Sequence, residues 1–218
     1  MRHAQSEENA GRKPEHLHPH IHITPLGKKQ SVLLARMLED SKPERIISSN
    51  YTRAQETAHI VGKRLGITVD TWEGIHEFSF VGHELWQTMT LHKREQSIQK
   101  FFDLCDPYLS WEEGETFAQF RDRILPAEFC KKVLAAPQSD IVVITHGYVM
   151  KLIMLESMYP RLFYSWTPEE QMREFVNFHR TLRIPNTAIL DMEFWGDKKR
   201  IVRPLHFYHL PRKYVTFP

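Results

Sequence analysis

Ile141-Val142-Val143-Ile144-Thr145-His146-Gly147 carries the clearest signal for the architecture of this 218-residue chain. Four β-branched apolar residues in a row are typical of a parallel strand that is covered on both faces. A helical pattern from about Tyr148 to Met158 follows directly, so His146 and Gly147 stand where a strand passes into a helix. In α/β sheets, such junctions present free helix N–H groups to anionic ligands. The stretch therefore predicts an α/β domain with a ligand site at the carboxyl end of this strand.

Neighbouring segments repeat the alternation of strand and helix. Thr24-Pro25 indicates a helix start, because Thr can cap the helix and Pro fits the first helical position. Asn50 follows one short β-branched run as a cap, and Gly66 marks the end of the helical pattern after it. Near the end of the chain, Gly196-Asp197 indicates a hairpin-like turn between two strands. The expected strands cover residues 45–49, 67–72, 141–144, 187–195 and 200–209, and the expected helices cover 25 to about 42, 54–65 and 148–158.

Residues 84–134 interrupt this alternation with a helix-rich stretch that is broken by Pro107, Gly114 and Pro126. We expect an inserted helical lobe over the carboxyl edge of the sheet, with its aromatic residues mostly in the core. The predicted fold class is α/β, a three-layer sandwich with a mainly parallel central sheet. Residues 1–218 are expected to form a single domain. A domain of this size can bury most of its apolar surface in one core.

Composition excludes several classes of protein. The formal net charge of +2 is too small for a nucleic-acid binder, which would carry a concentrated basic face. Cys105 and Cys130 are the only cysteines, so no disulfide framework is indicated and a reducing, cytoplasmic compartment is favoured. No apolar run approaches the ~20 residues of a membrane span.

Charged and imidazole side chains occur at several of the predicted strand–helix junctions. Arg2-His3 at the start of the chain, Arg53 after Ser48-Ser49, and His146 would meet at one edge of the sheet. Two guanidiniums can neutralise a phosphoryl group, and one imidazole can attack it. Positive neighbours lower the pKa of a histidine, so Arg2 and Arg53 would also keep His3 neutral and nucleophilic. His146 would donate to a phosphoryl oxygen, assisted by the N–H groups of the helix that follows it.

A phosphoester also needs an acid for its leaving oxygen. Glu77 is our candidate, because it follows a strand-like segment and its apolar neighbours would raise the pKa of its carboxyl group. Glu73 and Glu84 are alternatives that spacing alone does not separate from Glu77.

These motifs together resemble the histidine phosphatase superfamily, in its phosphoglycerate-mutase-like branch. The resemblance spans nearly the whole chain in the family's order, although Ala4 stands where the family usually has glycine. The matching segments are Arg2-His3-Ala4-Gln5-Ser6-x-x-Asn9, Thr24-Pro25-Leu26-Gly27-x-x-Gln30, Ser49-x-x-x-Arg53-Ala54-x-x-Thr57-Ala58, Gly114-Glu115-Thr116 with Arg121, Thr145-His146-Gly147 and Pro185-Asn186-Thr187-Ala188.

The resemblance implies a phosphomonoesterase that works through a phosphohistidine on His3, with Glu77 as proton donor. It implies that Arg2, Arg53, His146 and Gly147 surround the phosphate of a small phosphorylated substrate. By the same resemblance Asn9 contacts the phosphoryl group and Thr24 approaches the substrate. No metal or cofactor is implied.

Particular residues argue for or against other functions. His16, His18, His20 and His22 would share one face of an extended segment, but a loop at the pocket mouth is favoured over a metal site. A phosphoglycerate-type mutase is the nearest alternative, yet the lobe offers only Lys93-Arg94 for a second anionic group. A non-catalytic phosphate-binding module is a further alternative, and the histidine nucleophile argues against it. The sequence does not indicate an oligomeric state.

The start of the chain departs from the family pattern. The Arg-His pair of this family ends a central parallel strand, whereas here only Met1 precedes it. We expect the chain as given to be a shortened form, with apolar residues upstream that complete the strand.

Overall fold

The computed structural model describes residues 1–125, 140–195 and 198–217. Within these residues, a parallel sheet has β1 (Arg45–Ser49) between β2 (Val69–Trp72) and β3 (Ile141–Ile144). Ile46 of β1 pairs with Val69 on one side and with Val142 on the other. The predicted parallel sheet is confirmed.

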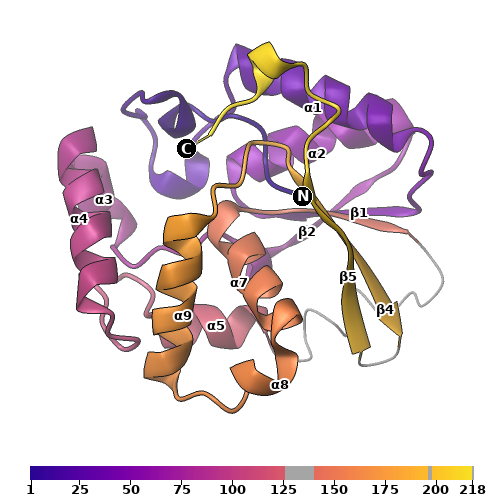
Figure 1. The fold of residues 1–218 in the computed structure, drawn as a ribbon. Coiled ribbons are helices and arrows are strands. Elements are labelled where there is room, and N and C mark those ends of the chain that lie inside the picture. Colours follow the sequence, from indigo (N-terminus) through magenta and orange to yellow (C-terminus); the bar gives the residue numbers. More distant parts are fainter. Residues whose placement is uncertain (126–139, 196–197, 218) are drawn as a thin grey trace.

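Helices cover both faces of this sheet and give it three layers (Figure 1). One face carries α1 (Pro25–Leu38) and α2 (Thr52–Leu65), and the other carries α5 (Phe117–Ile124), α7 (Gly147–Met158) and α9 (Pro168–Thr181). Side chains alternate along β1, so Ile46 packs in the core under α1 and α2 while Ile47 packs in the core under α7 and α9. This two-sided burial explains why Ile46 and Ile47 of β1 and all four residues of β3 are apolar.

Helix boundaries follow from local chemistry. The Thr24 side chain accepts a hydrogen bond from the Gly27 amide at 3.0 Å, and Pro25 occupies the first position of α1. Gly66 ends α2 with φ +72°, a left-handed conformation that glycine adopts without strain. Thr116 and Gln119 form a capping box at the start of α5.

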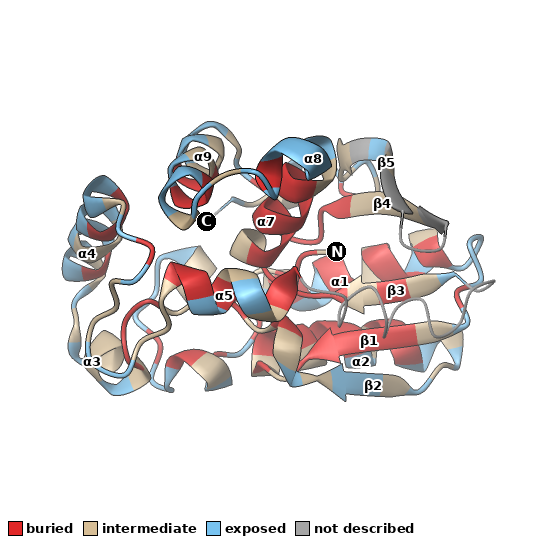
Figure 2. Cartoon of the chain, turned by 90° about the horizontal axis from the view of Figure 1, so that it is seen from below, coloured by how far each residue is buried: buried red, intermediate tan, exposed pale blue. Residues whose placement is uncertain are grey.

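The lobe lies beyond the carboxyl ends of the strands, where α3 (His83–Thr88), α4 (Leu91–Leu104) and α5 gather (Figure 2). Its aromatic side chains are largely core, since Phe101, Phe117 and Phe120 have no exposed surface. Residues 126–134 of the predicted lobe, with Pro126 and Cys130, lie outside the described residues. The remaining short elements are η1 (Glu8–Ala10), η2 (His18–His20), η3 (Glu73–Ile75), α8 (Pro160–Phe163) and η4 (Arg212–Tyr214).

The last strands, β4 (Ile189–Trp195) and β5 (Lys198–His206), pair antiparallel as predicted. The predicted turn at Gly196-Asp197 lies outside the described residues. The start of the chain runs between β3 and the segment before β4: the His3 amide donates to the Thr145 carbonyl at 2.8 Å, and the Arg2 amide donates to the Ala188 carbonyl at 2.9 Å. The Arg-His pair thus occupies the carboxyl edge of the sheet next to β3. The upstream extension stays a prediction.

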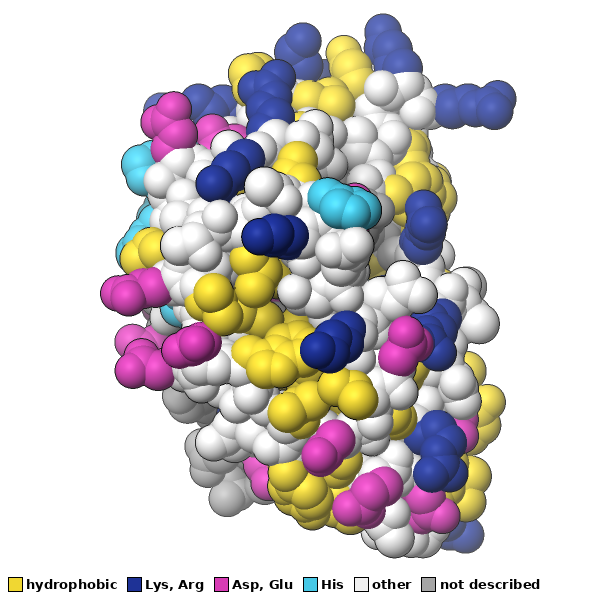
Figure 3. All heavy atoms as spheres, turned by 90° about the vertical axis from the view of Figure 1, so that its left-hand side faces the viewer, with side chains coloured by type: hydrophobic (Ala, Val, Ile, Leu, Met, Phe, Trp, Pro, Cys, Tyr) yellow, Lys and Arg dark blue, Asp and Glu magenta, His cyan; other side chains and the backbone are white. Residues whose placement is uncertain are grey.

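The surface agrees with the modest net charge. The face on the left of Figure 1 mixes basic, acidic and hydrophobic side chains instead of presenting one continuous basic area (Figure 3). In the part of the chain that the structure describes, no helix is both long and apolar enough to cross a membrane.

Candidate active site

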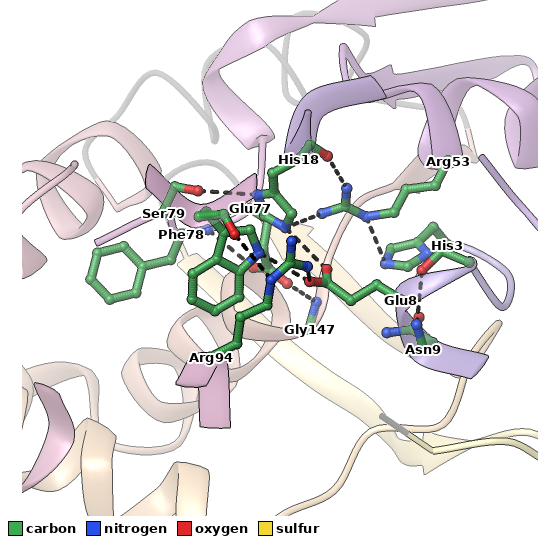
Figure 4. Close-up of polar contacts among 12 residues, drawn as sticks. His3, Glu8, Asn9, His18, Arg53, Glu77, Phe78, Ser79, Arg94 and Gly147 are labelled. Atoms are coloured by element: carbon green, nitrogen blue, oxygen red, sulfur yellow. Dashed lines mark hydrogen bonds and ion pairs between the residues drawn. The ribbon is translucent and has the colours of Figure 1, made fainter. Parts of the chain in front are cut away.

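A cavity of about 600 Å³ opens between the carboxyl edge of the sheet and the lobe. Its lining includes most of the side chains that the sequence singled out. Arg2, His3, Asn9, Arg53, Glu77 and Gly147 all contribute to it. These residues come from widely separated parts of the chain, and they meet because β1 and β3 end at the edge of the sheet where α2 and α7 begin and where the start of the chain lies (Figure 4).

His3 has a defined protonation state and orientation. Its Nδ1 lies 2.7 Å from the Ala4 carbonyl oxygen, which can only accept, so Nδ1 carries the proton. The other ring nitrogen, Nε2, therefore carries an electron pair, which accepts a hydrogen bond from Nε of Arg53 at 3.3 Å. Burial lowers the pKa of His3 well below its usual value, and the charges of Arg53 and Arg2 lower it further. A neutral imidazole with an available Nε2 is the form that can act as a nucleophile.

Arg2 and Arg53 are almost fully buried, at 4% and 3% exposed. Nη1 of Arg53 donates to the carbonyl of His18 at 2.8 Å, and Nη1 of Arg2 donates to the carbonyl of Ile184. Nε of Arg2 has no partner among the described residues. Two oriented guanidiniums with donor capacity to spare suit the oxygens of a phosphoryl group.

The ring of His146 packs against the ring of His3, with the two ring centres 5.1 Å apart. It has no exposed surface, and it is not part of the cavity lining. Its Nε2 is 2.8 Å from the Ser49 hydroxyl, while its Nδ1 has no partner in the described part of the chain. The Ser49 hydroxyl also accepts from the amide of Tyr51 at 3.3 Å, and it can donate to or accept from Nε2 of His146.

Glu77 caps the helix that follows His146. Its carboxylate accepts hydrogen bonds from the amides of Gly147 at 3.0 Å and Tyr148 at 3.1 Å. The first helix N–H groups, which we expected to assist the phosphoryl group, thus donate to Glu77 instead. Burial raises the pKa of Glu77, although Arg53 and Arg2 oppose the rise. A carboxyl group with a raised pKa beside the phosphate pocket suits a general acid.

The alternatives for the acid differ from Glu77 in position. Glu73 and Glu84 are both exposed, and neither belongs to the cavity lining. Thr24 also lies apart from the cavity, because its side chain caps α1 and donates to Gln5 Oε1 at 2.7 Å. Asn9 is close to Arg2, and its Oδ1 accepts from Asn186 Nδ2 at 2.9 Å.

The structure adds residues that the sequence reasoning did not select. His18, from the histidine run, is buried against Arg53, with Nε2 of His18 3.3 Å from Nη2 of Arg53. Glu8 accepts from Nη1 of Arg94 at 2.6 Å and from Nε1 of Trp86 at 3.0 Å, which joins the start of the chain to the lobe. Sequence spacing does not predict contacts between residues so far apart in the chain. The run of alternating histidines was nevertheless a reason to consider His18 for the site.

The other histidines of the run, His16, His20 and His22, do not meet His18 at a common site. The His22 ring is 2.8 Å from Glu56 Oε1, and His16 packs against His22 with ring centres 5.2 Å apart. No group of three or more possible metal ligands occurs among the residues described here.

Comparison with known proteins identifies the family. The family model of the histidine phosphatase superfamily (branch 1) matches residues 1–204. A Hydrogenobacter thermophilus protein named "Putative phosphoserine phosphatase 2" is 28% identical over 171 residues, which cover 71% of this chain and 74% of that protein. Glucosyl-3-phosphoglycerate phosphatase of Mycobacterium tuberculosis is 27% identical over 162 residues, which cover 67% of this chain and 68% of the relative.

Solved structures agree on the fold. The α-ribazole phosphatase of Shigella flexneri superimposes with a TM-score of 0.68 at 19% identity, over 94% of this chain and 93% of that one. The chain therefore belongs to branch 1 of the histidine phosphatase superfamily, and it is a phosphatase of that family.

Proposed function

We propose that this histidine phosphatase hydrolyses a small phosphomonoester by transferring the phosphoryl group first to His3 and then to water. The observation that carries the proposal is the state of His3, which lines the cavity: the Ala4 carbonyl holds the ring proton on Nδ1, so Nε2 keeps an electron pair, which accepts a hydrogen bond from Nε of Arg53 at 3.3 Å. Nucleophilic attack needs that electron pair and the neutral ring that burial favours.

The first half of the reaction forms the phosphoenzyme. His3 Nε2 attacks phosphorus, the bond to the ester oxygen breaks, and Glu77 gives its proton to the departing alcohol. Arg2 and Arg53 bind the phosphoryl oxygens, whose charge grows in the transition state.

The second half returns the enzyme to its starting state. Glu77, now a carboxylate, takes a proton from a water that attacks the phosphohistidine. The phosphorus–nitrogen bond breaks, inorganic phosphate leaves and His3 is again neutral.

An unpaired buried donor supports a phosphoryl group at this position. Nε of Arg2 has no partner in the described residues, and a buried donor without an acceptor costs about 1–3 kcal/mol. The position where Gly147 would carry a Cβ atom is 3.6 Å from Nε of Arg2, so this donor lies close to the start of α7. An oxyanion bound beside Arg2 and Arg53 would satisfy this donor.

The size of the cavity supports a small substrate. Its volume of about 600 Å³ is in the range of small-molecule sites. The curated relatives are named for phosphoserine and glucosyl-3-phosphoglycerate, which are small phosphorylated compounds. Cofactor chemistry has no part in the proposed mechanism.

The test is release of inorganic phosphate from a panel of phosphomonoesters, with wild type and His3→Ala side by side. Wild type should hydrolyse at least one member, and His3→Ala should lose essentially all turnover while keeping its thermal unfolding transition. Conversion of a phosphoester to its isomer without phosphate release would favour the mutase, and binding without turnover would favour the non-catalytic module. Activity should survive a chelator, whereas loss that zinc restores would contradict the metal-free mechanism.

A further inference from the structure

A second cationic group lines the cavity beyond the phosphate pocket. Lys151 lies on α7 one helical turn after Gly147, and its side chain is buried at 7% exposed. Arg183, an exposed residue between α9 and β4, lines the same part of the cavity. Neither residue takes part in the proposed transfer of the phosphoryl group to His3.

The ammonium group of Lys151 is held by neutral groups. Its Nζ lies 2.9 Å from Nδ1 of His179 and 3.3 Å from the His179 carbonyl, and it sits 5.8 Å from the centre of the Tyr148 ring. Burial and the charge of Lys151 lower the pKa of His179 to about 3, so this ring stays neutral and accepts from the lysine. His179 in turn packs against Tyr148 and Phe102, with ring centres 5.1 and 4.7 Å apart. Lys151 is therefore fixed in place.

No carboxylate lies within ion-pair distance of Lys151 or Arg183 in the described part of the chain. Burial lowers the pKa of Lys151 to about 8, with a further contribution from Arg2, and the group is still mostly charged at neutral pH. Buried charges in proteins are normally paired, because an unpaired charge loses its hydration without compensation. The cavity beside Lys151 is thus prepared for an anion that the chain itself does not provide.

We infer that Lys151, with Arg183 at the rim, binds a carboxylate on the leaving group of the substrate. The inference rests on the proposed function and narrows its substrate to phosphomonoesters with a second negative charge. A single buried ammonium matches a singly charged carboxylate, whereas the two guanidiniums at His3 match the phosphoryl dianion. Lys151 lies about 6 Å along the helix axis from the level of Gly147, a separation that a leaving group of a few atoms can span.

The experiment compares substrates that differ only at the inferred carboxylate. O-phosphoserine is paired with O-phosphoethanolamine, and 3-phosphoglycerate is paired with glycerol 1-phosphate. Glycerol 1,3-bisphosphate tests a second phosphate in place of the carboxylate, and 4-nitrophenyl phosphate measures phosphoryl transfer independently of this subsite. Each substrate is tested with wild type, Lys151→Met and Lys151→Arg. Lys63→Met serves as the control for loss of a lysine charge, since Lys63 is exposed on α2 and outside the cavity.

Wild type should favour the carboxylate member of at least one pair by tenfold or more in kcat/KM. Lys151→Met should reduce that preference at least tenfold, chiefly through KM, while Lys151→Arg restores most of it and Lys63→Met leaves it unchanged. Equal losses on both members of a pair would overturn the inference, because Lys151 would then serve the phosphate pocket or the fold. A wild-type enzyme without preference, or with preference for the bisphosphate, would also overturn it.

The two proposals fail in different ways. Hydrolysis of 4-nitrophenyl phosphate without any carboxylate preference would refute the carboxylate subsite and leave the proposed function intact. Failure to hydrolyse any phosphomonoester would refute the proposed function, and the subsite with it.

Discussion

Replacing Arg123 with Met is expected to weaken the fold and the acid step together. Arg123 lies on α5, and its guanidinium makes two hydrogen bonds to Glu115, at 2.5 and 2.8 Å. The same group donates to the carbonyls of Gly74, His76 and Glu77 at 3.1, 2.9 and 3.4 Å. The lobe thereby holds the backbone of the segment that carries the proposed acid.

The magnitude follows from burial. Breaking a fully buried ion pair costs about 3–5 kcal/mol, and the side chains of Arg123 and Glu115 are 17% and 15% exposed, so we expect a loss of about 2–4 kcal/mol. Movement of Glu77 should also lower kcat/KM for alkyl phosphates by about tenfold, part of the 10²–10⁴-fold that a general acid supplies. Aryl phosphates should lose less, because their leaving oxygen hardly needs a proton.

Urea unfolding measures the first effect, and the ratio of alkyl to aryl kcat/KM measures the second. Arg121→Met is the matched control on the same helix, since Arg121 contacts exposed Asp122 and the Gln171 side chain. It should cost about 1 kcal/mol and leave the ratio unchanged. Equal stability of the two variants, together with an unchanged ratio in Arg123→Met, would refute the reasoning.

Further predictions concern the site itself. Arg53→Ala should lose about 2–4 kcal/mol of transition-state stabilisation, the scale for one preorganised donor, and an unchanged kcat/KM would mean that Arg53 does not contact the phosphoryl group. Glu77→Gln should lower kcat/KM far more for alkyl than for aryl phosphates, and equal losses on both would indicate a binding or structural role. Stability should fall as pH decreases from 7 to 5.5, because burial lowers the pKa values of His3, His18 and His146 and only the unfolded chain then takes up their protons. Each such histidine contributes up to about 1.4 kcal/mol per pH unit below ~6.5, and urea unfolding at both pH values that gave equal stabilities would contradict this.

Most of the fold could be predicted from local sequence patterns. The apolar run of β3 predicted two-sided burial, the β-branched run of β1 predicted a strand, and Thr24 and Gly66 predicted a helix start and a helix end. The helix α9 (Pro168–Thr181) was not predicted, although Thr167 and Glu170 form a capping box that signals its start.

Only those site residues that belong to sequence motifs could be predicted. His3, Arg53 and Glu77 belong to recognisable segments, and strand order brings them to one cavity. Glu8 and Arg94, which form an ion pair, are 86 positions apart in the sequence. The inferred role of Lys151 depends on its contact with the neutral ring of His179, which leaves the lysine charge without a carboxylate partner. Such contacts depend on packing between segments, which periodicity and spacing do not encode.

Trapping the phosphoenzyme tests most directly whether His3 is the nucleophile. In Glu77→Gln, 4-nitrophenyl [³²P]phosphate should still phosphorylate His3, while attack by water slows because the base is missing. The intermediate should then accumulate, survive alkali, break down in acid and map to a peptide that contains His3. Absence of the label when His3 is also replaced by Ala is the expected control. Turnover of the substrate by Glu77→Gln with label on another residue, or label that persists without His3, would contradict the mechanism.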